Sequence, residues 1–130
     1  MAINIKHIDT QHQDERGDLT EILDCAEFPI KAILRITSKA GTVRANHYHK
    51  KDSHYIYIES GKAEYSERPA DKPEADLEKV LMGPGDMVLT GPNVAHAVKF
   101  LEDTVFYALT TEPRDQELYE KEIVRVKLVE

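Results

Sequence analysis

Histidine is the residue type whose spacing in this sequence points most directly to chemistry. Three of the six histidines fall in the segment GTVRANHYHKKDSHYIYIESG, over residues 41–61, and a fourth ends the segment GDMVLTGPNVAH. These four are His47, His49, His54 and His96. Neutral imidazole is the commonest protein ligand for zinc, nickel, copper and Fe(II), and its pKa near neutrality also suits it to act as a base.

The pattern around these histidines indicates that they converge. His47 and His49 are two residues apart in the strand-like run VRANHYH, so both side chains leave the same face of a sheet. The chain then turns through residues 50–53 and enters a β-rich run that begins with His54, which in an antiparallel hairpin can face the other two. With His96 as the fourth ligand, we expect a four-nitrogen site for a divalent transition metal, namely Zn, Ni, Fe or Cu.

The elements that must position these residues are typical of an all-β protein. Short runs rich in β-branched residues are separated by Gly, Pro and Asn turn signals, which predicts a sandwich or barrel. No convincing helical pattern comes before the C-terminal tail. Apart from the two histidine-bearing strands, we expect strands over 1–8, 18–23, 30–37, 62–67, 77–82, 86–90, 94–100, 104–110 and 123–128, and a short helix within 112–122.

Length and composition restrict the classes of function. At 130 residues the chain is expected to form one domain, over residues 1–130. Its net charge of -7 argues against general nucleic-acid binding, which needs a basic face. Neither a signal peptide nor an apolar run long enough to cross a membrane is recognisable, so we expect a cytoplasmic protein. The single cysteine, Cys25, is expected to have a packing role.

The spacing of glycines and histidines resembles the two sequence motifs of the cupin superfamily. The first motif is matched over residues 41–61 by Gly41, His47, His49, His54 and Gly61. The second is matched over residues 85–100 by Gly85, Asp86 and His96. This resemblance implies a double-stranded β-helix, the jelly-roll barrel, with the ligands inside the barrel mouth, where a small-molecule substrate would bind.

Two departures from the cupin pattern have physical consequences. His54 stands where the first motif usually has Glu, which replaces an anionic oxygen by a neutral nitrogen and favours Ni, Cu, Zn or Fe(II) over Mn. Gly91 and Asn93 stand where the second motif usually has Pro and Gly. Both residues suit a tight turn, since Asn tolerates a positive φ, so the loop is expected to be kept.

A narrower resemblance links the chain to cupins that act on sugar nucleotides. The segment DERGDLTEIL followed by RANHYHKK is similar to the arrangement in dTDP-4-dehydrorhamnose 3,5-epimerases and dTDP-4-keto-6-deoxyglucose 3,4-ketoisomerases, and an NHYH-like segment occurs in capsular polysaccharide cupin domains. The resemblance implies that Arg44 holds the nucleotide phosphates and that His47 is the catalytic base. It also implies an isomerase or epimerase-like role in polysaccharide biosynthesis.

Some features leave other functions open. The epimerases have a catalytic Tyr shortly after two threonines, whereas Thr110 and Thr111 are followed here by Glu112 and Pro113. A His47 that binds metal through its available nitrogen cannot also be the base. A metal-dependent dioxygenase and a non-catalytic small-ligand binding protein are therefore the alternatives. Cupins often pair through sheet edges, so we expect a homodimer.

Overall fold

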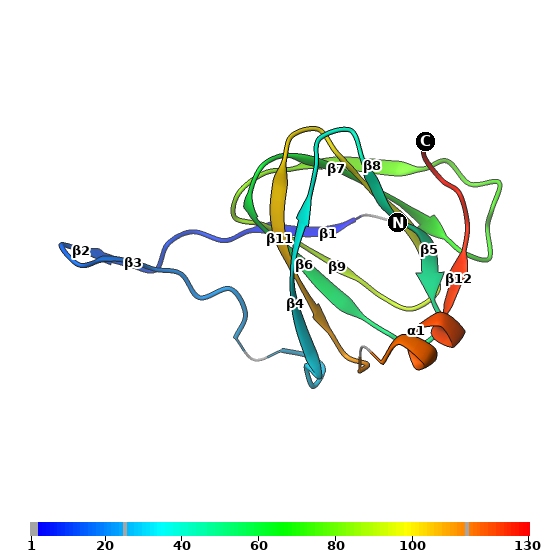
Figure 1. The fold of residues 1–130 in the computed structure, drawn as a ribbon, viewed down its shortest axis with the longest axis horizontal. Helices are drawn as coiled ribbons and strands as arrows, with labels where there is room; N and C mark the ends of the chain where they lie inside the picture. The colour runs from blue at the N-terminus through cyan, green and yellow to red at the C-terminus, as the bar shows by residue number, and fades with distance from the viewer. Residues whose placement is uncertain (1–2, 25, 114) are drawn as a thin grey trace.

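The computed structural model describes residues 3–24, 26–113 and 115–130, and Figure 1 shows their arrangement. The elements are β1 (Asn4–His7), β2 (His12–Asp14), β3 (Gly17–Leu19), β4 (Ala32–Ser38), β5 (Val43–His49), β6 (His54–Ser60), β7 (Ala63–Pro69), β8 (Glu78–Met82), β9 (Asp86–Thr90), β10 (Val94–Phe100), β11 (Thr104–Thr110), α1 (Gln116–Glu122) and β12 (Ile123–Arg125). Cys25, for which we expected a packing role, lies outside the described residues. Within them, no helix is both long and apolar enough to cross a membrane.

Two five-stranded antiparallel sheets face each other and enclose the core. The first has the strand order β1-β9-β6-β11-β4 and the second the order β12-β5-β10-β7-β8. From β4 onward the chain passes from one sheet to the other at almost every connection, which is the connectivity of a jelly roll. The predicted all-β, double-stranded β-helix is confirmed.

The core between the sheets is built from the inward-facing residues of both. Ile58 on β6 and Phe100 on β10 have no exposed surface, and Phe100 stacks on Phe106 of β11 with ring centroids 5.5 Å apart. Tyr65 on β7 is also fully buried and hydrogen-bonds through its hydroxyl to Glu67 and Thr90. This apolar packing fills one part of the barrel, and the four histidines occupy another.

A second apolar cluster lies on the outer face of the first sheet. Tyr55 of β6 belongs to this cluster, and its side chain is 6% exposed. It packs with Met87 and Leu109, and the partly buried residues Ile8, Ile22, Leu23 and Ile30 of the N-terminal segment cover this cluster. The covering layer is therefore supplied by the chain's own N-terminal segment.

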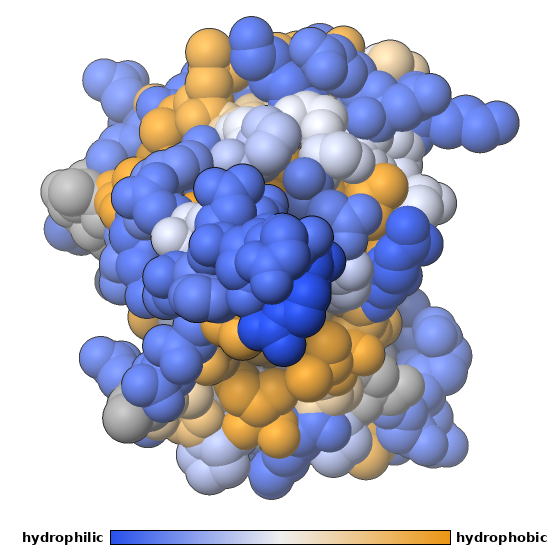
Figure 2. All heavy atoms as spheres, turned by 90° about the vertical axis from the view of Figure 1, so that its left-hand side faces the viewer, coloured by the Kyte–Doolittle hydropathy of each residue, from blue (hydrophilic) through white to orange (hydrophobic). Residues whose placement is uncertain are grey.

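The strand predicted over residues 18–23 is formed only over residues 18 and 19, as part of β3. Gly17, with φ of 135°, follows a tight turn in which Arg16 binds the Asp14 carboxylate, and the chain forms the short hairpin β2–β3 that ends at Leu19. Ile22 and Leu23 then pack on the outer cluster instead of extending a strand. The hairpin projects from the barrel (Figure 1), and its hydrophilic side chains stand in front of an apolar area in Figure 2.

The last strand is also shorter than predicted, because β12 ends at Arg125 and not at residue 128. Its partner strand β5 bends at Asn46, and the Asn46 side chain forms hydrogen bonds to the C-terminal segment. Asn46 Oδ1 accepts hydrogen bonds from the backbone N–H groups of Leu128 and Val129, and Asn46 Nδ2 donates to the Val129 carbonyl. Beyond the backbone hydrogen bond from the Val126 N–H to the Asn46 carbonyl, side-chain hydrogen bonds therefore replace the ladder.

Candidate active site

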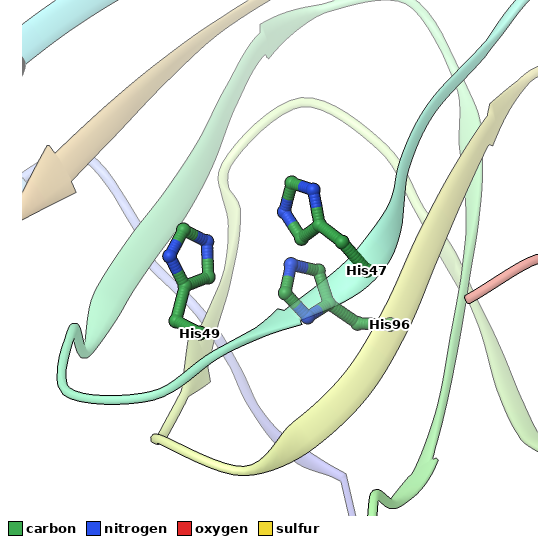
Figure 3. A group of neighbouring side chains, drawn as sticks. All are labelled: His47, His49 and His96. Carbon is green, nitrogen blue, oxygen red and sulfur yellow. The ribbon is translucent and has the colours of Figure 1, made fainter. Parts of the chain in front are cut away.

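The structure brings together all four histidines singled out in the sequence. His47 and His49 come from β5, His54 from β6 and His96 from β10, and all four are buried. The rings of His47 and His49 have centroids 4.7 Å apart, and those of His47 and His96 are 4.9 Å apart (Figure 3). The centroid of His54 lies 5.0 Å from those of both His49 and His96. The predicted convergence is thus present in the fold.

A bulge in β5 places Arg44 on the same inner face. Ala45 and Asn46 have φ values of 71° and 53°, and the pairing with β10 shifts there, so that His96 pairs with His47 and Val98 with Arg44. An uninterrupted strand would point residues 44 and 47 to opposite faces. Because the bulge inserts one residue, both Arg44 and His47 line the cavity at the cluster.

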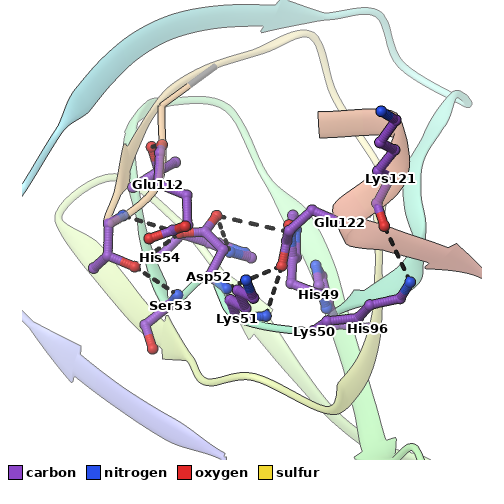
Figure 4. A network of polar contacts seen from close by, with 12 residues as sticks. His49, Lys50, Lys51, Asp52, Ser53, His54, His96, Glu112, Lys121 and Glu122 are labelled. Carbon is purple, nitrogen blue, oxygen red and sulfur yellow. Dashed lines mark hydrogen bonds and ion pairs between the residues drawn. The ribbon is translucent and has the colours of Figure 1, made fainter. Parts of the chain in front are cut away.

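His49 is oriented by a carboxylate from the C-terminal helix. Its Nδ1 lies 2.5 Å from Glu122 Oε1, while Glu122 Oε2 accepts the backbone N–H groups of Lys51 and Asp52 at 2.8 and 3.0 Å (Figure 4). Burial would raise the pKa of Glu122, but the hydrogen bonds from Asp52, Lys51 and His49 together lower it. An ionised Glu122 holds the hydrogen of His49 on Nδ1 and leaves Nε2 as a lone-pair donor.

Asp52 adds a buried carboxyl group that the sequence pattern did not indicate. Its side chain is 3% exposed and lies between two histidines, with Oδ2 3.7 Å from His49 Nδ1 and 3.9 Å from His54 Nδ1. Oδ1 accepts hydrogen bonds from the N–H and hydroxyl of Thr111 at 2.9 and 3.0 Å. Burial raises the pKa of Asp52 despite these hydrogen bonds.

His96 is the most deeply buried of the four. Burial lowers its pKa to about 4, although Nδ1 donates a hydrogen bond to the Val94 carbonyl at 2.9 Å. The ring is therefore neutral at pH 7, and its Nε2 carries a lone pair. His96 has the protonation state that a metal ligand requires, and as a weak base it is poorly suited to accept a proton.

The cluster lines an inner cavity of about 150 Å³. Arg44 stands at its wall, where Nε donates to Ser38 Oγ at 2.7 Å and an Nη group donates to the Thr37 carbonyl at 3.0 Å. Tyr119 of α1 forms another part of the wall, with its ring centroid 6.4 Å from His47 and 6.0 Å from His49. The inner cavity thus combines a cation, imidazoles and a phenol.

The donor set fits a divalent transition metal. Ligand atoms of His47, His49 and His96 lie within 4.8 Å of one another, as do those of a second group made of His49, Asp52 and His54. Three imidazoles, two of them oriented by Nδ1 hydrogen bonds, are donors typical of Zn, Cu, Ni or Fe(II) sites. The four predicted ligands therefore divide into two overlapping groups that share His49.

Comparisons with known proteins identify a matching family and proteins of similar fold. A model of the cupin domain family matches residues 34–111. A 3,4-ketoisomerase from Helicobacter canadensis has a TM-score of 0.79 at 20% identity, covering 96% of this chain and 91% of that chain. The QdtA 3,4-ketoisomerase from Thermoanaerobacterium thermosaccharolyticum, a double mutant in complex with TDP, is 26% identical, with a TM-score of 0.75 and coverage of 96% and 89%.

A more distant likeness is to the rmlC epimerase of Mycobacterium tuberculosis, at 16% identity and a TM-score of 0.74, covering 96% of this chain and 72% of that chain. No curated protein matches the sequence. The narrower resemblance noted in the sequence therefore agrees with the structural neighbours, which include sugar-nucleotide isomerases and an epimerase.

Proposed function

The chain belongs to the cupin domain family, and on that premise we propose that it is an isomerase of a nucleotide-linked keto sugar. The observation that carries the proposal is the buried imidazole pair of β5, in which Glu122 orients His49 beside His47 at a cavity also lined by Arg44. Abstraction of a proton next to a ketone needs an oriented base with a pKa near neutrality, and imidazole meets that requirement. The likeness to 3,4-ketoisomerases supports the same reaction class.

The proposed reaction exchanges a ketone with the neighbouring hydroxyl-bearing carbon. A β5 imidazole takes the proton from that carbon, and the electron pair of the broken C–H bond forms an enediolate with the former carbonyl. The hydroxyl proton moves to the former carbonyl oxygen, and a proton is returned from the imidazolium to the former carbonyl carbon. No atom or electron is gained or lost overall, so the reaction needs no external oxidant or reductant.

Two residues have a claim to the role of base. The sequence resemblance assigns it to His47. His49 is an equal candidate because of its contact with Glu122. A carboxylate that holds the Nδ1–H group leaves Nε2 as the proton acceptor and stabilises the imidazolium that forms. Arg44 is proposed to hold the sugar-linked phosphate, since two of its five N–H donors bind Ser38 and Thr37 and thereby fix the guanidinium at the wall.

The test is conversion of TDP-4-keto-6-deoxyglucose by the purified wild-type chain, followed by NMR. We expect the ketone to appear at the neighbouring carbon, and we expect this product to disappear with a His47→Asn, His49→Asn double variant. A wild-type protein that leaves this compound and related nucleotide-linked keto sugars unchanged would refute the proposed function.

A divalent transition metal bound by His47, His49, His54 and His96 is the alternative arrangement of the site, because an imidazole nitrogen that binds the metal cannot also take the proton. Such a metal would act as a Lewis acid that polarises the sugar ketone. The four buried imidazoles also favour a second candidate, a metal-dependent dioxygenase of a small molecule. Elemental analysis of tag-free protein tests both ideas: near-stoichiometric Fe, Ni or Cu that is lost in His54→Ala supports the dioxygenase, whereas metal-free protein with full turnover excludes it.

A further inference from the structure

We propose that a second cavity, next to the histidine cluster, binds the nucleoside and its adjoining phosphate. The inference rests on the proposed function, because it assigns the part of the substrate that the reaction leaves unchanged. This outer cavity lies between the turn after β5, the loop after β11 and helix α1, and its volume is about 360 Å³. None of its lining residues except Tyr119 belongs to the inner cavity.

The sizes of the two cavities indicate how they divide the ligand. Cavities that bind small molecules usually measure about 300–1,000 Å³. The inner cavity, at about 150 Å³, is below that range and suits a single sugar ring, whereas the outer cavity lies within it. Tyr119 lines both cavities, so in this assignment the ligand extends past its side chain.

Three lysines line the outer cavity in a protein of net charge -7. Lys50 and Lys51 come from the turn after β5, and Lys121 comes from α1. Lys50 Nζ donates to the Lys121 carbonyl at 3.1 Å, which joins the two segments (Figure 4). Lys121 Nζ forms an exposed ion pair with Glu117 at 3.4 Å, and a surface pair of this kind is weak enough to be exchanged for a contact with a phosphate.

Three carboxyl groups also line the outer cavity, and they differ in how far they oppose the binding of a phosphate. Glu122 and Asp52 direct their oxygens into hydrogen bonds with the protein, so these oxygens are already engaged. Glu112 is half-buried, and its carboxylate forms no hydrogen bond or ion pair with any described residue. A carboxylate in that position can accept hydrogen bonds from ribose hydroxyls.

The other residues that line the outer cavity present apolar side chains to the solvent. Leu118 is 56% exposed, and it borders the outer cavity together with Pro113 and the ring of Tyr119. A planar base that covers these side chains would remove apolar surface from water and stack on the phenol ring. The outer cavity thus offers a site for each part of a nucleotide: a floor for the base, a carboxylate for the ribose and lysines for the phosphate.

The experiment measures the binding of TDP and thymidine by isothermal titration calorimetry at two salt concentrations. A Lys51→Ala, Lys121→Ala double variant should weaken TDP binding about tenfold or more and reduce its salt dependence, while thymidine binding changes little. Leu118→Ala should weaken both ligands. Lys72→Ala is the control, because it removes the same charge from an exposed loop outside both cavities.

The outcomes separate this proposal from the proposed function. If the wild-type protein converts the keto sugar and the lysine and Leu118 variants bind TDP as tightly as wild type, the outer-cavity assignment is wrong and the function stands. If the wild-type protein neither binds TDP nor converts any nucleotide-linked keto sugar, both fail. Loss of TDP binding in Lys72→Ala to the same extent would show a general charge effect and would also overturn the assignment.

Discussion

At the scale of single residues, the contact between His49 and Glu122 decides which ring nitrogen faces the cavity. Replacing the carboxylate by an amide in Glu122→Gln keeps the shape but removes the charge that stabilises a protonated His49. We expect kcat/KM for the keto sugar to fall by about 10- to 100-fold, the range usual for groups that orient a catalytic or ligating histidine.

A control variant on the same helix distinguishes a loss of His49 orientation from a loss of folding. Glu120→Gln, on the exposed face of the same helix, is the matched control and should leave kcat/KM unchanged. A Glu122→Gln protein with wild-type kcat/KM and an unchanged pH profile would contradict the role assigned to this carboxylate.

Asn46 shows how one residue supports both the bulge and the C-terminal segment. It combines a φ of 53° with three hydrogen bonds to the backbone of residues 128 and 129. Asn46→Gly should lose only the hydrogen bonds, whereas Asn46→Ala should also strain the backbone, so Ala should be the more destabilising of the two. We expect a loss of about 1–3 kcal/mol in the free energy of unfolding for Ala, measured by urea denaturation. Equal stability of the Gly, Ala and wild-type proteins would contradict this account.

At the scale of elements, the barrel strands were more predictable than the parts that complete the site. Alternating residues in β5, β6 and β10 carry the histidines, and this alternation is readable in the sequence. The bulge at Ala45 and Asn46 is not, because neither residue type requires a positive φ. Glu122, Asp52 and Tyr119 were missed for another reason: they come from a turn and a short helix, and only the fold shows that these meet the histidines.

Strands β7 and β9 contain a buried polar network that makes stability depend on pH. Burial raises the pKa of Glu67, although the Tyr65 hydroxyl donates to its Oε1 at 2.8 Å and partly opposes the rise. Because the folded protein holds this proton more tightly than the unfolded chain, the contribution of Glu67 to stability is fully present below the unfolded pKa. It is lost as the pH rises through the folded pKa.

The variant Glu67→Gln isolates this effect, since an amide cannot ionise. We expect the stability of the variant relative to wild type to increase as the pH rises from about 4 to 7, in urea denaturation series at several pH values. A relative stability that is constant over this range, or that decreases with pH, would contradict the buried, proton-binding state of Glu67.

At the scale of the whole molecule, the projecting hairpin suggests how two chains would associate. A two-stranded hairpin alone is marginally stable, and β2–β3 stands away from the barrel with Leu19 59% exposed (Figure 1). Ile33, on the edge strand β4, is 69% exposed. Both features are consistent with the homodimer expected from the sequence, which stays a prediction.

Light scattering coupled to gel filtration tests that prediction. The wild-type chain should elute as a dimer, and Leu19→Glu should shift it toward the monomer because a charge replaces an apolar contact. Leu101→Glu, at an exposed turn residue of the barrel, should remain dimeric. A wild-type protein that is monomeric at micromolar concentration would refute the predicted homodimer.

The central claim is that a β5 imidazole removes a proton next to the ketone of a nucleotide-linked sugar. The most direct measurement follows TDP-4-keto-6-deoxyglucose in D₂O by NMR with wild type, His47→Asn and His49→Asn. We predict that wild type exchanges deuterium into the carbon beside the ketone, and that at least one of the single variants loses this exchange and is thereby identified as lacking the base. Exchange at the wild-type rate in both variants, or none in the wild type, would contradict the claim.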